Sequence, residues 1–127
     1  FHFPLLRLPD IMLIYAEAVN ELNAGPDAEA YRQINRIRTR ANATPFSGMN
    51  QDEFRSAVLE ERARELAYEA DRRYDLFRWG VYLDVMNAID MDEHNVTKRR
   101  LERNLLYPIP TSEVNSNDKI DVNNPGW

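Results

Sequence analysis

Apolar residues recur at steps of three and four over the first third of the chain, which predicts a pair of helices. Between Pro9 and Leu22 this spacing marks one helix, because such residues share a single helical face. Proline suits a first helical turn, and Gly25-Pro26 ends the helix. We expect its buried face to consist of Ile11, Ile14, Tyr15, Ala18 and Leu22.

A second helix is predicted from about Asp27 to Ala41. Its inner face should hold Ala30, Ile34, Ile37 and Ala41. After a loop over residues 42–50, Asn50 is a candidate N-cap for a third helix that runs to about Glu69, because Glu53 completes a capping-box pattern. The apolar stripe predicted for this third helix is Leu59, Ala63, Leu66, Ala67 and Ala70.

The rest of the chain is less regular. A short helix is expected over 71–79, and further amphipathic turns over 81–89 would align Val81, Val85 and Ile89. Residues 90–103 are polar and predict a loop. The prolines in 105–110 favour extended backbone. Thr111 is a candidate cap for a helical turn, and residues 123–127 predict a turn-rich tail.

These elements predict an all-α fold of tetratricopeptide-like helical hairpins, with an irregular and extended C-terminal segment. The hairpin 9–42 spans roughly the ~34 residues of one such repeat. A helix pair at 50–80 and an irregular part at 90–127 follow. Helical repeats bury their faces by stacking, and about three are needed for stability. We therefore expect the chain to depend on further sequence, or to use its extended segment as a lid.

The composition of the chain excludes several classes of function and several kinds of site. The net charge of −5 argues against a protein that binds nucleic-acid phosphates through a basic face. No apolar run approaches the ~18 residues of a membrane-spanning helix. The chain has no cysteine, so disulfides and cysteine metal sites are excluded. It opens with Phe1 and without a signal peptide, and we expect it to be the C-terminal portion of a larger protein.

Charged and aromatic side chains are most concentrated in residues 61–80, which hold five arginines, five acids and four aromatic residues. Buried charges need partners, so we interpret the segment as a paired structural clamp. The alternative is a sugar platform, on which Trp79 or Tyr74 would stack. The residues assigned to the structural motif are Glu65, Glu69, Arg72, Asp75, Arg78 and Trp79.

Acidic clusters offer weaker alternatives. Glu61, Glu65 and Glu69 share one helical face, where a metal or acid–base role is conceivable, but ion pairs with the arginines at 62, 64, 72 and 73 are favoured. A second group, at 90–94, has no glycine and no distal glutamate of an EF-hand loop, so a solvated loop is favoured. Its members are Asp90, Asp92, Glu93 and His94. We predict no catalytic residue, no cofactor and no metal.

Aromatic residues near loops are the usual surface for stacking sugars. The ligand-binding candidates are Tyr82, Trp79 and Phe46. Tyr107 and Trp127 are of the same kind. For Trp79 the alternative is the structural clamp, and for the other four it is a packed hinge or tail; we favour these alternatives.

Three motifs in order resemble the SusD-like (RagB/SusD) family. The main one matches at Arg64, Glu65, Leu66, Ala67, Glu69, Arg72, Asp75, Leu76, Arg78, Trp79 and Gly80. An Ile-Asn-Arg-Ile-Arg-Thr-Arg-Ala run at 34–41 precedes it. Pro-Ile-Pro at 108–110 and Asn-Pro-Gly-Trp at 124–127 follow it. Two departures stand out, because Ala70 replaces the family's glycine and Arg73 replaces its tryptophan.

The resemblance implies the C-terminal portion of a nutrient-binding lipoprotein on the outer membrane of Bacteroidota. Such proteins bind glycans or other nutrients, are not enzymes, and work with a SusC-like TonB-dependent transporter. The lipid anchor would lie outside these 127 residues. The alternative function is a tetratricopeptide-like protein-interaction module without a small-molecule ligand.

Overall fold

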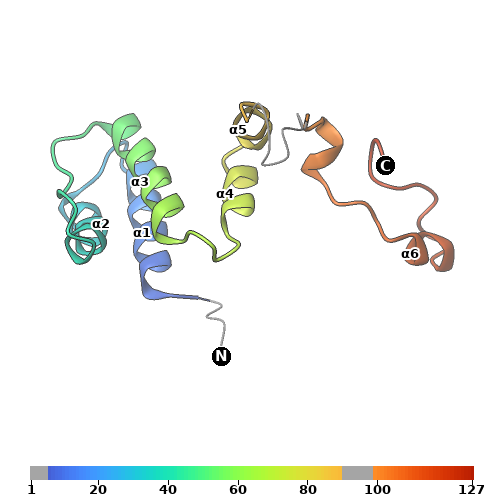
Figure 1. The fold of residues 1–127 in the computed structure, drawn as a ribbon, viewed down its shortest axis with the longest axis horizontal. Helices are drawn as coiled ribbons and strands as arrows, with labels where there is room; N and C mark the ends of the chain where they lie inside the picture. The colour runs from blue at the N-terminus through green and yellow to red at the C-terminus, as the bar shows by residue number, and fades with distance from the viewer. Residues whose placement is uncertain (1–5, 90–98) are drawn as a thin grey trace. The chain divides into compact units, whose positions relative to one another are not determined.

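The computed structural model describes residues 6–89 and 99–127, and these are helical, with no strand among them (Figure 1). The all-α prediction is therefore confirmed. The chain divides into two compact units, Phe1–Arg72 and Arg73–Trp127. This boundary falls inside the helix pair predicted at 50–80, and the grouping into repeats stays a prediction. Within the described ranges, no helix combines the length and the apolar character that crossing a bilayer requires.

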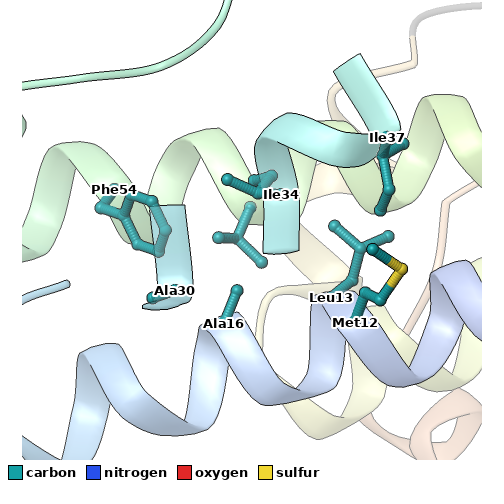
Figure 2. Close-up of a cluster of buried hydrophobic side chains, with 8 residues drawn as sticks. Met12, Leu13, Ala16, Ala30, Ile34, Ile37 and Phe54 are labelled. Carbon is teal, nitrogen blue, oxygen red and sulfur yellow. The ribbon is translucent and has the colours of Figure 1, made fainter. Parts of the chain in front are cut away.

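Unit 1 is a three-helix assembly centred on its first helix. Helix α1 (Leu8–Leu22) packs against both α2 (Ala28–Arg40) and α3 (Gln51–Glu65) (Figure 1). Figure 2 shows the apolar core where the three helices meet. Its members are Met12, Leu13 and Ala16 from α1, Ala30, Ile34 and Ile37 from α2, and Phe54 and Val58 from α3.

The ends of these helices follow the local sequence signals. Pro9 lies in the first turn of α1. Asp27 caps α2 by accepting a hydrogen bond from the backbone N–H of Ala30 at 2.7 Å. At the start of α3 the predicted capping box is confirmed, because Asn50 Oδ1 accepts from the Glu53 N–H at 3.0 Å and Glu53 accepts from the Asn50 N–H at 2.9 Å.

The face of α1 predicted to be buried is exposed, so this prediction was wrong. Leu22 is 84% exposed, Ile11 and Ile14 are each 45% exposed, and Tyr15 is 42% exposed. The buried residues of α1 are Met12, Leu13, Ala16 and Asn20. The helix carries apolar side chains on two opposite sides, so helical spacing matches either side and cannot select between them.

The stripe predicted for α3 was also wrong in part. Leu66 is buried, but Ala67 and Ala70 are exposed. Helix α3 buries Phe54, Val58, Glu61 and Arg62 instead. A search for apolar spacing misses a face that includes charged side chains. On α2 the prediction is confirmed for Ala30, Ile34 and Ile37, whereas Ala41 is an exposed C-cap residue.

The break after α3 forms without a glycine at position 70. The helix ends at Glu65, before the predicted end at Glu69. Tyr68 and Ala70 then adopt left-handed backbone, with φ of 66° and 71°. This region costs a side chain roughly 1–2 kcal/mol, and glycine adopts it freely. Ala70 therefore occupies a strained position, and surrounding contacts must hold it.

Unit 2 consists of short elements. They are α4 (Arg72–Arg78), which begins one residue before the unit boundary, α5 (Tyr82–Asn87), the 3₁₀ turn η1 (Glu102–Leu105) and α6 (Thr111–Ser116). The face predicted at 81–89 was wrong, because Val85 and Ile89 are exposed while Tyr82 is buried. Thr111 is the first residue of α6 and makes no side-chain capping bond.

The tail holds the extended segment through side-chain amides. Asn123 accepts from the Ile109 N–H at 2.7 Å and donates to the Ile109 carbonyl at 2.9 Å. Asn124 donates to the Tyr107 carbonyl at 2.6 Å, and the Trp127 indole N–H donates to the Arg103 carbonyl at 2.9 Å. The tail 123–127 and the segment 103–109 are thus joined in one substructure.

Replacing Ala70 by glycine should stabilise the protein. We expect Ala70→Gly to raise the free energy of unfolding by about 1 kcal/mol, because glycine removes the left-handed strain. Urea denaturation followed by circular dichroism measures this change. The matched control is Ala41→Gly at a position with φ of −81°, where no gain is expected. A loss of stability in Ala70→Gly would contradict the assignment of strain.

Candidate functional site

A cluster of charged side chains lies along the C-terminal half of α3 and its continuation. We call it the α3 charge cluster. Its acidic members on or after α3 are Glu61, Glu65 and Glu69, and Arg62 lies among them. The partners come from other parts of unit 1, and they are Arg7, Asp10, Arg38 and Arg40.

Glu61 is the acidic centre of this cluster. Its side chain is 6% exposed, and its Oε2 lies 2.7 Å from Nη1 of Arg38 on α2. Arg38 also donates to the Thr44 carbonyl at 2.6 Å and lies over the Phe46 ring, 3.8 Å from its centroid. One guanidinium therefore joins α2, α3 and the loop between them.

Arg62 and Asp10 make the corresponding link between α3 and α1. The Arg62 side chain is 5% exposed, and its Nη1 lies 2.8 Å from Oδ1 of Asp10. A buried guanidinium is costly unless it is paired. This pair accordingly constrains how α1 and α3 can pack.

Arg7, just before α1, binds the end of α3 and the segment that follows it. It donates to both carboxylate oxygens of Glu69, at 2.8 and 2.6 Å, and to the Glu65 carboxylate at 3.1 Å. The hydrogen bond to Glu69 is the main reason that the pKa of Arg7 is raised. The same bond holds the pKa of Glu69 below its usual range. Glu65 also pairs with Arg40 at the end of α2.

Ion pairing of the three glutamates is thus confirmed, and it includes partners that were not predicted. Arg64 does lie 3.4 Å from Glu61, as one-turn spacing suggested. The closer pairs come from Arg7, Arg38 and Arg40. A pattern within one helix could not find these residues. Arg38 and Arg40 do lie in the Ile-Asn-Arg-Ile-Arg-Thr-Arg motif, which was the available signal.

A concave surface of about 760 Å³ adjoins this cluster. We call it the Phe46 depression, and its lining includes Arg38, Phe46, Asp52, Glu53, Ser56 and Glu60. Asn35 fixes the Phe46 backbone, accepting from its N–H at 2.7 Å and donating to its carbonyl at 2.9 Å. The carboxylates on the rim can accept hydrogen bonds from hydroxyl groups. The surface therefore offers hydrogen-bond acceptors to a hydroxylated ligand.

The candidates in unit 2 lie in a cluster of aromatic rings around Arg73. The Tyr82 side chain is buried, with its ring centroid 4.3 Å from that of Phe77. The Arg73 guanidinium lies 5.0 Å from the Phe77 ring, 5.6 Å from Tyr82 and 4.5 Å from Tyr107. Arg73 is thus a cation among aromatic rings, an arrangement that stabilises packing. Tyr82 offers little open ring surface.

Trp79 and the remaining motif residues combine pairing with partial exposure. Asp75 is buried and lies 3.2 Å from Arg78, whose guanidinium lies 5.2 Å from the Trp79 ring. Trp79 is half-buried. Arg72 donates to the Leu59 carbonyl at 3.5 Å. These contacts fit the clamp interpretation for 72–79, while the ring of Trp79 keeps some accessible surface.

The described residues contain no group of three or more histidine, aspartate or glutamate side chains placed to hold a metal ion. The acidic group at 90–94, with Asp90, Asp92, Glu93 and His94, lies outside the described residues.

The sequence matches the model of the SusD family over residues 2–127. The chain belongs to the SusD family. It is 39% identical to SusD-like protein P25 of Formosa agariphila over 97% of its length. It is 34% identical to starch-binding protein SusD of Bacteroides thetaiotaomicron over 94% of its length.

Solved SusD-family structures share the fold. The crystal structure of a SusD homolog from Bacteroides thetaiotaomicron superposes with a TM-score of 0.79, at 34% identity over 97% of this chain. A SusD superfamily protein from Parabacteroides distasonis gives 0.79 at 28% identity over 98% of this chain. The chain spans only about a quarter of these proteins, with 24% of P25, 21% of the starch-binding protein, and 26% and 27% of the two structures covered.

Neutralising Glu61 should destabilise unit 1 far more than neutralising its neighbour. In Glu61→Gln, the largely buried Arg38 loses its counter-charge, so we expect a loss of about 3 kcal/mol in the free energy of unfolding. Glu60→Gln is the matched control, because its pair with Arg64 is exposed and should contribute less than about 0.5 kcal/mol. Urea denaturation of both variants gives the comparison. Equal losses would contradict the structural role of Glu61.

Acid should weaken the Arg7–Glu69 contact. The folded-state pKa of Glu69 is lowered, so this carboxylate stabilises the fold above its unfolded-state pKa. That stabilisation is lost as the pH falls through the lowered folded-state pKa. The deficit of Glu69→Gln relative to the parent protein should therefore be largest near pH 7 and shrink towards pH 3. Urea denaturation across this range tests the idea, and a constant deficit would contradict it.

Proposed function

We propose that these 127 residues form part of an outer-membrane nutrient-binding lipoprotein that takes up glycans together with a SusC-like TonB-dependent transporter. Family membership over residues 2–127 carries this proposal. A relative 34% identical to the chain is named a starch-binding protein, which supports a glycan as the ligand class. The lipid anchor and the remaining receptor would be supplied by sequence outside this chain.

The contacts of the family motif support a framework role within that receptor. Glu65 and Glu69 are engaged by arginines from other elements of unit 1. Asp75 is buried beside Arg78. Side chains used in this way hold helices together and have little freedom to contact a varying ligand. We therefore assign the motif to the scaffold and expect ligand choice to depend on other surfaces.

Within this chain, the Phe46 depression is the ligand contact that the geometry supports best. It combines the half-buried edge of Phe46 with a rim of carboxylates and Ser56. Trp79 is the second candidate, because its ring is partly accessible. Tyr82 ranks below both, because its side chain is buried against Phe77.

We propose binding without catalysis. Hydrolysis of a glycosidic bond generally needs two carboxyl groups on opposite sides of a cleft, ~5–9.5 Å apart. Glu61 and Glu65 instead lie on successive turns of one helix, and arginines engage both. Such carboxylates suit a framework and not an acid–base pair.

Affinity electrophoresis of the full-length protein tests the glycan proposal. Native gels containing starch, xylan or pectin should retard the protein relative to a gel without polysaccharide, with serum albumin as the non-binding control. We expect Phe46→Ala to reduce the retardation if the Phe46 depression contacts the ligand, with Phe77→Ala as the matched control. Failure of every polysaccharide and oligosaccharide to bind would contradict the glycan proposal and favour the protein-interaction alternative.

A further inference from the structure

Helix α1 contacts its neighbours through polar residues as well as through its apolar core residues, and its outward face is apolar. Asp10 pairs with Arg62 of α3 at 2.8 Å. Asn20 is completely buried and donates to the Gln51 carbonyl at 3.0 Å. Glu21 pairs with Arg55 of α3 at 2.6 Å. At the edge of a protein, by contrast, the outer face of a helix is normally polar.

The outward face forms a continuous apolar row, which we call the outer stripe. It consists of Ile11, Ile14, Tyr15, Ala18 and Leu22. All five are exposed, and Leu22 reaches 84%. Single exposed apolar residues are normal. Five at successive helical positions form a patch, and such patches mark surfaces that contact another element.

The partners of α1 within unit 1 leave this row uncovered. The core residues Met12, Leu13 and Ala16 face α2 and α3 on the other side of the helix (Figure 2). A helix that is apolar on two opposite sides belongs between two packed layers. Unit 1 supplies one of these layers.

The shape of the outer stripe fits one more helix. A 15-residue helix is about 22 Å long, so the stripe can pair with a helix of similar length. Ala18 lies at its centre, between the larger Ile14 and Leu22. A small central residue allows helix axes to approach to the usual 8–10 Å.

We propose that the outer stripe is covered by an amphipathic helix of the same polypeptide, from the part that the longer relatives have and these 127 residues do not. The relatives are about four times as long as the aligned region, since this chain covers 24% of P25 and 26% of the solved homolog. Helical repeats obtain their stability from stacked neighbours, which gives a physical reason for such a helix. The proposal does not depend on glycan binding.

Photo-crosslinking in the full-length protein tests which element covers the stripe. Tyr15 is replaced by p-benzoylphenylalanine, the protein is irradiated, and cross-linked peptides are identified by mass spectrometry. We expect an intramolecular cross-link to a helix outside the 127 residues. The positive control carries the same probe at Tyr31, whose ring lies 5.0 Å from Phe54 and which should react within unit 1.

Four outcomes would overturn the proposal. They are a cross-link between two copies, a cross-link to a different protein, a cross-link confined to the 127 residues, and no cross-link from Tyr15 while Tyr31 reacts.

Thiol labelling of Leu22→Cys gives an independent measurement if the probe at Tyr15 prevents folding. In a background without other cysteines, the native full-length protein should react roughly 100-fold more slowly than the same variant in urea, since buried positions react only through local opening. The protection should not change with protein concentration. A native rate within a few-fold of the unfolded rate would overturn the proposal, as would protection that appears only at high concentration.

Discussion

The packing of unit 1 depends on how α3 satisfies two charges that it buries. Glu61 and Arg62 are adjacent, and both are about 95% removed from solvent. Taking a charge out of water costs several kcal/mol unless an opposite charge meets it. Arg38 of α2 pairs with Glu61, and Asp10 of α1 pairs with Arg62. A slide or rotation of either helix would strand a buried charge, so these pairs specify one arrangement where apolar contacts alone would tolerate several.

Charged side chains also find partners outside the three helices, and the residues involved include the family motif. Arg7 holds Glu65 and Glu69 after the chain has left α3, in a stretch where Tyr68 and Ala70 adopt left-handed backbone. In unit 2 the cation is Arg73, and aromatic rings surround it. The residues by which the chain resembles the SusD family are thus largely engaged in internal contacts. These contacts support the proposed framework role of the motif.

Local signals predicted much of the fold. The capping box at Asn50 and the inner face of α2 required only neighbouring residues, and both are confirmed apart from Ala41. The inner face of α1 could not be predicted, because two opposite sides are apolar. The partners of the α3 glutamates could not be predicted either, since Arg7 and Glu69 are 62 positions apart in the chain. Among the candidate ligand residues, spacing alone could not show that Phe77 would cover Tyr82.

The coupling energy between Asp10 and Arg62 tests the central claim most directly. A double-mutant cycle with Asp10→Asn, Arg62→Met and the double variant, measured by urea denaturation, isolates the pair from the effects of each single change. If paired burial of charge determines the packing of unit 1, the coupling should be at least about 2 kcal/mol, well above the ~0.2–1 kcal/mol of exposed pairs. A coupling indistinguishable from zero would contradict the account, because the helices would then be held by apolar packing alone.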